Sequence, residues 1–188
     1  KTQYNVIINA LQCDNGGEFI NSDLRSLFST NGIVYRFSCP HTSPQNGKAE
    51  RLIRTTNDIV RTLLLQANLT PPFWGEALHT ATYLLNRRPS RAITPYTPYH
   101  LLHGVQPDFT HLRVFGCLCY PNLYATMDNK LSPRSSPCVF PGYPLEQKGY
   151  RCYDLTTRRV IVSRHVTFDD NVFPYTPTPP WHTNPTTT

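Results

Sequence analysis

The sequence predicts an α/β segment, followed by a small antiparallel β-barrel and by a Pro/Thr-rich tail that stays disordered. Apolar residues recur at helical spacing over 48–67 and 72–86. From Leu112 onward, short β-rich segments alternate with turn residues. After Pro174 the chain is rich in Pro and Thr and almost uncharged, so it cannot bury enough surface to fold. The predicted division is therefore 1–110, 111–173 and 174–188.

The α/β segment is predicted to open with a buried strand, because an apolar run over 6–11 leads directly to Asp14. The Asn-Gly-Gly sequence at 15–17 favours a sharp turn just after that carboxylate. Ser22 is then predicted to cap a short helix, and the next strand is expected over 33–38.

A long helix is predicted over 48–67, with an apolar stripe along one side. At about 100° per residue, Arg54 and Arg61 fall within about 40° of Glu50 on the opposite face. The stripe consists of Leu52, Ile53, Thr56, Ile59, Val60, Leu63 and Leu64.

A second helix is predicted over 72–86, where Trp74 is expected to pack in the core. A Thr-Pro pair at 97–98 opens a short helix that reaches Leu102. The buried stripe of the second helix is predicted to be Phe73, Trp74, Ala77, Leu78, Ala81, Leu84 and Leu85.

Five short strands are predicted after Leu112, and such a series suggests a small antiparallel barrel. Pro141 lies within the second of them and cannot donate a ladder hydrogen bond, so that strand is expected to be an edge or to be weakened. The five segments are 113–120, 137–143, 149–155, 160–163 and 165–169.

The composition favours a polyanionic partner without proving one. The net charge is +6 and the pI is about 9.1, as expected either for a nucleic-acid-binding protein or for an ordinary basic domain. No apolar run of 18 residues exists, so no membrane span is expected. The six cysteines lack zinc-knuckle spacing and are interpreted as buried, reduced thiols in a reducing intracellular compartment.

Asp14 and Glu50 are the candidate catalytic residues and metal ligands. Each alone has an ordinary explanation, because Asp stabilises turns and Glu near a helix start interacts favourably with the helix dipole. Together, a carboxylate that ends a strand and a carboxylate that opens a helix could hold a pair of Mg²⁺ (or Mn²⁺) ions, with substrate phosphates and water as further ligands. Two such ions support an in-line phosphoryl displacement.

Four basic residues accompany Glu50 on the long helix and are candidate DNA-binding residues: Lys48, Arg51, Arg54 and Arg61. They would meet the phosphate backbone beside the carboxylate. The alternative is an ordinary solvated helix face.

At this point the chain resembles the Pol polyprotein of copia-type (Pseudoviridae) long-terminal-repeat retrotransposons, over about residues 9–173 and in family order. The two central motifs are DNGGEF at 14–19 and PHTSPQNGKAER at 40–51, with 35 residues between the two carboxylates. The further motifs are FWGEA at 73–77, YLLNR at 83–87, TPY at 97–99, LRVFGC at 112–117, GYRCYD at 149–154 and SRHVTFD at 163–169.

The resemblance implies a truncated RNase H-like integrase core that joins element DNA to host DNA with Mg²⁺, followed by a Src-homology-3-like barrel. It also implies double-stranded DNA as partner (element ends and target), a homo-oligomer in the complete protein, and a nuclear location with a cytoplasmic virus-like-particle stage. The family's first catalytic Asp and its zinc-binding domain would precede Lys1, so this segment alone is expected to be inactive. The barrel is expected to be closer to autonomous folding than the core.

Two other functions remain open from the sequence. One is a nucleic-acid-binding remnant without chemistry, and the other is a host-adopted scaffold whose barrel binds proteins. An upstream strand that carries the first Asp would distinguish the integrase from both.

Overall fold

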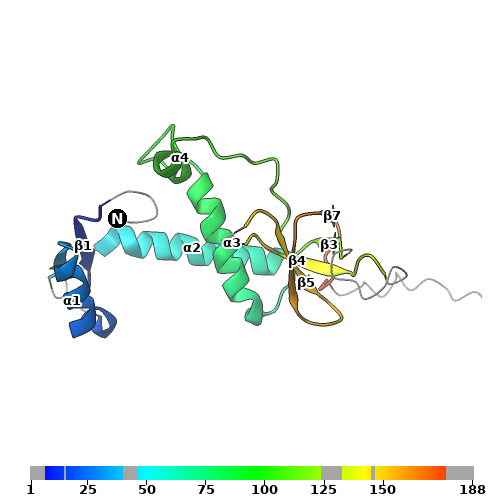
Figure 1. Cartoon of the computed structure of the whole chain (residues 1–188), viewed down its shortest axis with the longest axis horizontal. Helices are drawn as coiled ribbons and strands as arrows, with labels where there is room; N and C mark the ends of the chain where they lie inside the picture. The colour runs from blue at the N-terminus through cyan, green and yellow to red at the C-terminus, as the bar shows by residue number, and fades with distance from the viewer. Residues whose placement is uncertain (1–6, 15, 40–45, 124–132, 145–146, 177–188) are drawn as a thin grey trace, which may run out of the picture.

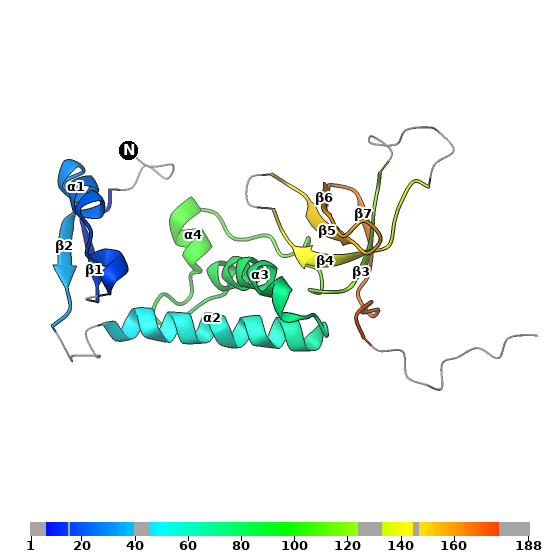
Figure 2. The same cartoon turned by 90° about the horizontal axis from the view of Figure 1, so that it is seen from below.

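The computed structural model describes residues 7–14, 16–39, 46–123, 133–144 and 147–176. Three groups of elements follow one another along the long axis of the molecule (Figures 1 and 2). The first strands and helices lie at one end, the later helices occupy the middle, and a five-stranded sheet, called the barrel below, lies at the other end.

The N-terminal group contains β1 (Ala10–Cys13), η1 (Gly17–Phe19), α1 (Ser22–Thr30) and β2 (Val34–Phe37). The strands β1 and β2 pair in parallel, with Ala10 opposite Val34 and Cys13 opposite Phe37. α1 packs on β2 through Phe28 and Tyr35, whose ring centroids lie 5.0 Å apart.

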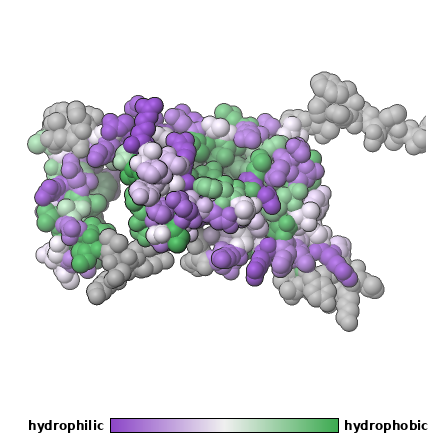
Figure 3. Space-filling view, turned by 90° about the horizontal axis from the view of Figure 1, so that it is seen from above, coloured by the Kyte–Doolittle hydropathy of each residue, from purple (hydrophilic) through white to green (hydrophobic). Residues whose placement is uncertain are grey.

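Two details of this group differ from the prediction. The N-cap is Asn21 and not Ser22, because the Asn21 side chain accepts the Leu24 N–H at 2.7 Å. The segment predicted as a buried strand is also largely exposed. Ile7 and Ile8, which precede β1, are 71% and 53% exposed. Among the described residues this sheet has only two strands, so its apolar side chains have little to pack against, as the exposed hydrophobic atoms at this end show (Figure 3). Val6 lies outside the described residues.

The middle group confirms the predicted helices. It contains α2 (Gly47–Gln66), η3 (Pro71–Phe73), α3 (Trp74–Arg87) and α4 (Pro98–His103). α3 crosses α2 and contacts the sheet (Figure 2). None of the described helices is both long and apolar enough to cross a membrane.

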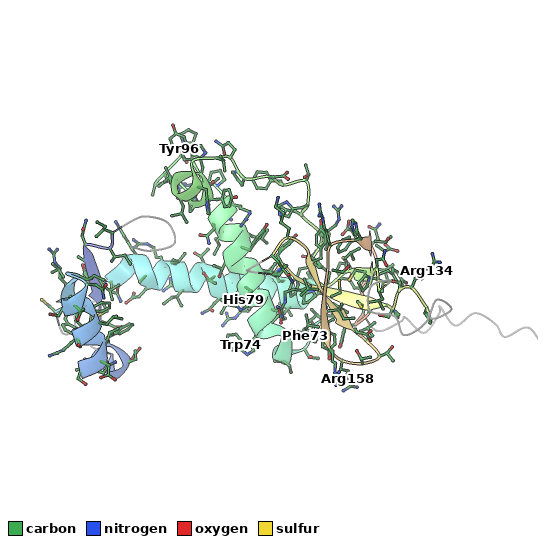
Figure 4. The ribbon with its side chains drawn as sticks, viewed as in Figure 1. Phe73, Trp74, His79, Tyr96, Arg134 and Arg158 are labelled. Atoms are coloured by element: carbon green, nitrogen blue, oxygen red, sulfur yellow. The ribbon has the colours of Figure 1, made fainter. Side chains whose placement is uncertain are left out.

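Trp74 is 60% exposed, so its predicted place in the core is wrong. Phe73 faces the barrel instead and packs edge-on against Tyr153 at 5.0 Å, whereas Trp74 begins α3 on the side away from the barrel (Figure 4).

The predicted apolar stripe of α2 is packed against other residues over only part of its length. Leu52 and Ile53, in the N-terminal half of this helix, are 60% and 61% exposed, whereas the packed apolar residues lie in its C-terminal half.

The C-terminal group confirms the five predicted antiparallel strands. These are β3 (Leu118–Pro121), β4 (Cys138–Gly142), β5 (Tyr150–Asp154), β6 (Val160–Ser163) and β7 (Val166–Asp169), in the spatial order β6-β5-β4-β3-β7. The first strand begins five residues later than predicted, at Leu118 rather than at Arg113.

Pro141 lies in β4, which is flanked by β3 and β5, so the expectation of an edge strand is wrong. The register between β4 and β5 shifts between Val139 and Gly142, and the proline occupies this irregularity. The sequence predicted either an edge strand or a weakened strand. The second alternative is observed, because the ladder of this central strand breaks locally at the residue that has no N–H.

The barrel core is rich in thiols. It comprises Cys117, Cys119, Cys138, Phe140, Tyr143 and Cys152. The four core cysteines are fully buried and none of them is in a disulfide, as predicted. Burial raises the pKa of Cys117 to about 12 and that of Cys138 to about 11. Cys39 differs from the prediction because it is exposed.

A second apolar cluster joins the helices to the barrel across residue 110. It comprises Ala67, Leu69, Ala77, Phe115 and Val139. The proposed boundary therefore runs through shared apolar packing, and separate folding of 111–173 remains a prediction. Two residues of the segment predicted as a tail pack against the helical group. Tyr175 packs edge-on against Phe73 at 5.7 Å, and the Asn68 amide donates to Thr176 Oγ1 at 3.0 Å. Residues 177–188 lie outside the described part.

Two glycines allow the helices to approach the barrel closely. Gly116 has φ +80° and lies against Ala67, whereas Gly142 has φ +128° and lies against Thr80. A Cβ atom at either glycine would overlap its neighbour, in addition to requiring an unfavourable backbone conformation. Thr80, which is 3% exposed, donates a hydrogen bond to the Pro141 carbonyl at 3.1 Å.

We expect Thr80→Val to destabilise the chain by about 1–3 kcal/mol, because it leaves the buried Pro141 carbonyl without its donor while keeping the side-chain shape. Thr82→Val is the matched control, since Thr82 is exposed on the same helix and its hydroxyl donates to the Leu78 carbonyl of its own helix. Its effect should stay within about 0.5 kcal/mol. Urea unfolding of both variants measures this, and equal losses would contradict the docking role of Thr80.

Thiol labelling tests the buried core. In the native chain at pH 8, we expect the exposed Cys39 to react quickly with a thiol reagent, while the core thiols react only on unfolding, because burial hides them from the reagent and raises the pKa of Cys117 and Cys138. Cys39→Ser should remove the fast phase. Fast labelling of two or more thiols in that variant would show that the barrel core is open.

Candidate functional site

Asp14 directly follows β1, where the chain leaves the parallel pair. Its side chain is exposed, and its Oδ1 accepts the Gly16 N–H at 3.2 Å. The turn that the sequence predicted thus orients the carboxylate by a local hydrogen bond. Asn15 lies outside the described residues.

Glu50 lies in the first turn of α2 and is exposed. It lines a shallow depression of about 440 Å³ that follows one face of the helix. The lining residues are Glu50, Ile53, Arg54, Asn57, Asp58 and Arg61.

The depression brings together three of the predicted residues, since Arg54 and Arg61 share it with Glu50 as the helical angles indicated. Lys48 and Arg51 are exposed on the same helix but do not line it. Sequence reasoning missed Asp58, which lies two helical turns beyond Glu50 and brings a second carboxylate to this face. The four charged residues of the depression therefore carry two positive and two negative charges.

The donor chemistry of Asp14 and Glu50 fits Mg²⁺, which prefers carboxylate oxygens and retains water ligands. Within the described ranges, no group of three or more His, Cys, Asp or Glu side chains is arranged to hold a metal ion. Residues 40–45, which lead into α2, lie outside these ranges. The pairing of Asp14 with Glu50 therefore remains a prediction.

A larger cavity of about 670 Å³ lies where the C-terminal end of α3 meets the barrel. Tyr83 and Arg87 of α3 face it, together with Tyr99, Asp108, His111, Tyr143, Lys148, Tyr150 and Arg164. One feature of the sequence pointed to this cavity: Tyr83 and Arg87 are four residues apart and therefore share a helix face. The other walls come from segments far apart in the chain, so periodicity could not reveal them.

The aromatic side chains of this cavity are fixed by one another. Tyr83 stacks on Tyr143 with ring centroids 4.4 Å apart and planes at 18°. The Tyr83 hydroxyl is hydrogen-bonded to His111 Nε2 at 2.5 Å, and the Tyr143 hydroxyl accepts the Arg113 N–H at 2.9 Å. Burial raises the pKa of Tyr143 to about 12 and also raises that of Tyr83, so both stay neutral.

A family model described as the retroviral polymerase SH3-like domain matches residues 117–181. The match covers all five strands of the barrel and extends beyond the predicted end at 173.

Curated relatives match nearly the whole chain. The retrovirus-related Pol polyprotein from transposon RE1 of Arabidopsis thaliana is 41% identical over 93% of this chain, and that from transposon RE2 of the same plant is 39% identical over 95%. The retrovirus-related Pol polyprotein from transposon TNT 1-94 of Nicotiana tabacum is 38% identical over 86%. The chain spans about 12% of the length of each of these relatives.

Two solved structures show a weaker likeness. A chain of the simian T-cell lymphotropic virus intasome in complex with PP2A regulatory subunit B56 gamma has a TM-score of 0.45 and 14% identity, covering 85% of this chain and 57% of that one. The catalytic core domain of BIV integrase has a TM-score of 0.40 and 26% identity, covering 53% of this chain and 61% of that one. An RNase H-like core remains a prediction at these scores.

Proposed function

We propose that this chain, which belongs to the family of retrovirus-related Pol polyproteins of transposons, is part of the enzyme that joins element DNA to host DNA. The observation that carries the proposal is 41% identity to such a polyprotein over 93% of the chain. The SH3-like match over 117–181 supports the same origin for the barrel. We assign the parent element to the copia type, on the order of the motifs along the chain.

In this proposal Asp14 and Glu50 are metal ligands of the active site. Gly16 orients the Asp14 carboxylate through its N–H, and α2 presents Glu50 from its first turn. Mg²⁺ (or Mn²⁺), when bound, supplies activation of an attacking oxygen and stabilisation of the leaving oxygen. Arg54 and Arg61 lie beside Glu50 and attract the phosphates of the DNA toward it.

Strand transfer belongs to the longer protein in this proposal. Two carboxylates leave a metal pair with few protein ligands, so the 188-residue chain alone is proposed to bind Mg²⁺ weakly and to lack activity. The longer protein acts on double-stranded DNA, both element ends and target, as a homo-oligomer. It works in the nucleus after a stage in cytoplasmic virus-like particles.

Substitution of the carboxylates tests the metal site. In a longer Pol protein that contains this segment and carries out strand transfer, Asp14→Asn and Glu50→Gln should each lower the rate by about 100-fold or more, because each removes an anionic ligand while keeping the shape. DNA affinity should stay nearly unchanged. Asp58→Asn is the control, since Asp58 lies in the same depression as Glu50 without an assigned ligand role. An active Glu50→Gln variant would refute the assignment.

The salt dependence of DNA binding tests the basic residues. Arg54→Ala and Arg61→Ala should each lower the slope of log affinity against log salt by about one unit if each contacts one phosphate. Lys48→Ala and Arg51→Ala remove charges outside the depression and should also lower the slope, because all four residues are assigned to DNA binding. Asp58→Asn should raise affinity by removing a repelling charge. Unchanged slopes for all four basic variants would identify the face as merely solvated.

A further inference from the structure

We propose that the cavity where α3 meets the barrel is a docking site for the proline-rich segment 177–181 of the same chain, with Trp181 packed among the tyrosines of the cavity. This segment has the sequence PTPPW and follows directly on the described residues, which end at Thr176. The docking needs neither the metal ions nor the DNA of the proposed function and is therefore independent of it.

The cavity presents aromatic rings of the kind on which proline and tryptophan side chains pack. The half-buried Tyr83, Tyr99 and Tyr150 line it, together with the buried Tyr143 and with Pro144. Grooves lined by aromatic side chains bind proline-rich segments because the polyproline II conformation is already stiff before binding and loses little entropy. A volume of about 670 Å³ lies in the range of pockets that bury a drug-sized molecule, which is the size of an indole ring with an adjacent proline.

The polar groups of the cavity match the backbone of such a segment. Its wall carries the hydrogen-bond donors Arg87, Gln147 and Lys148, whereas its one lining carboxylate, that of Asp108, already accepts from the N–H and hydroxyl of Thr110 at 2.9 and 2.8 Å. Proline has no N–H, and the carbonyls of a polyproline II segment have no internal partners, so the segment accepts many hydrogen bonds and donates few. A wall rich in donors therefore complements this backbone.

Arg87 is held in place as one of these donors. Its guanidinium carbon lies 3.4 Å from the centre of the Tyr83 ring and 4.6 Å from that of Tyr99, and its Nη1 donates to the Tyr83 carbonyl at 3.2 Å. Tyr83 is itself fixed by its stack on Tyr143 and by its hydrogen bond to His111. A side chain immobilised in this way loses little further entropy when it binds a carbonyl.

The end of the described chain places the segment within reach of the cavity. Tyr175 packs against Phe73, which directly precedes α3, and the cavity begins ten residues further along, at Tyr83. Ten residues of α-helix span about 15 Å, and the five residues of the segment span about 15 Å in the polyproline II conformation. Trp181 therefore reaches the cavity when the segment runs along α3 toward the C-terminal end of this helix.

Two observations select this segment over an outside partner. Pro177 and Pro180 are three residues apart, which is the repeat of the polyproline II helix, so they lie on one face of it. The match to the retroviral polymerase SH3-like domain also continues past β7 and ends at residue 181. The segment thus belongs to the same matched domain as the strands that form the barrel.

Acrylamide quenching of Trp181 fluorescence in the full 188-residue chain tests the docking. The chain has two tryptophans, so Trp74→Phe leaves Trp181 as the only one, and it does so at a side chain that is 60% exposed. The quenching constant should be about 3-fold lower than in a synthetic peptide of residues 177–188, because a filled pocket hides most of the surface of its ligand. Equal constants for the chain and the peptide would overturn the proposal.

Variants of the cavity locate the contact in this Trp74→Phe background. Tyr99→Ala, and separately Gln147→Ala with Lys148→Ala, should raise the quenching constant toward that of the peptide. Gln147 and Lys148 are exposed, so their replacement leaves the barrel core intact. Tyr96→Ala is the matched control, because Tyr96 is 45% exposed and does not line the cavity, and it should leave the constant unchanged. Cavity variants that behave like Tyr96→Ala would contradict the docking.

Variants of the segment test the other side of the contact without altering the packed body. Pro177→Ala with Pro180→Ala should raise the quenching constant, whereas Thr186→Ala with Thr187→Ala, beyond the segment, should not. Protection of Trp181 that disappears on dilution would assign the segment to a second copy and overturn its docking within one chain. Unchanged quenching in the proline variant, together with protection of Tyr99 from nitration by an added oligonucleotide, would make the cavity a polyanion site instead.

Discussion

The close approach of α2 and α3 to the barrel is the contact on which the rest of the structure depends. It is made by small residues: Ala67 lies against Gly116, and Thr80 lies against Gly142 and donates to the Pro141 carbonyl. Both glycines have positive φ, so larger residues would be excluded by conformation as well as by space. The hydroxyl of Thr80 satisfies a carbonyl on a strand whose ladder is interrupted by proline. The helix thus supplies a hydrogen bond at the point where the strand ladder is interrupted.

This contact makes the helices and the barrel one packed body. Apolar residues on both sides of residue 110 share a cluster, and Arg151 of β5 pairs with Glu76 of α3 at 2.6 Å. The Tyr83–Tyr143 stack adds an aromatic bridge at the other end of α3. The cavity exists only because these elements meet. By contrast, the N-terminal group retains exposed apolar residues such as Ile7, Ile8 and Val34.

The two candidate sites use charge differently. On α2, Arg54 and Arg61 alternate with Glu50 and Asp58, so the positive and negative charges of the depression balance. At the cavity, three cations face a single carboxylate that Thr110 already engages. In the proposed function, a nucleic acid is the partner of the α2 depression.

Local patterns in the sequence determined the helices, the five barrel strands and the candidate carboxylates, because periodicity and turn chemistry act over a few residues. The motif around Asp14 and the helical angle between Glu50, Arg54 and Arg61 were readable for the same reason. Tertiary structure alone decided which side of each element is covered. Trp74 is exposed because Phe73 packs on the barrel in its place, and Pro141 is central because Thr80 and a shift in register accommodate it. The cavity around Arg87 also required the fold, since its walls come from residues up to 81 positions apart, from Tyr83 to Arg164, that only long-range packing brings together.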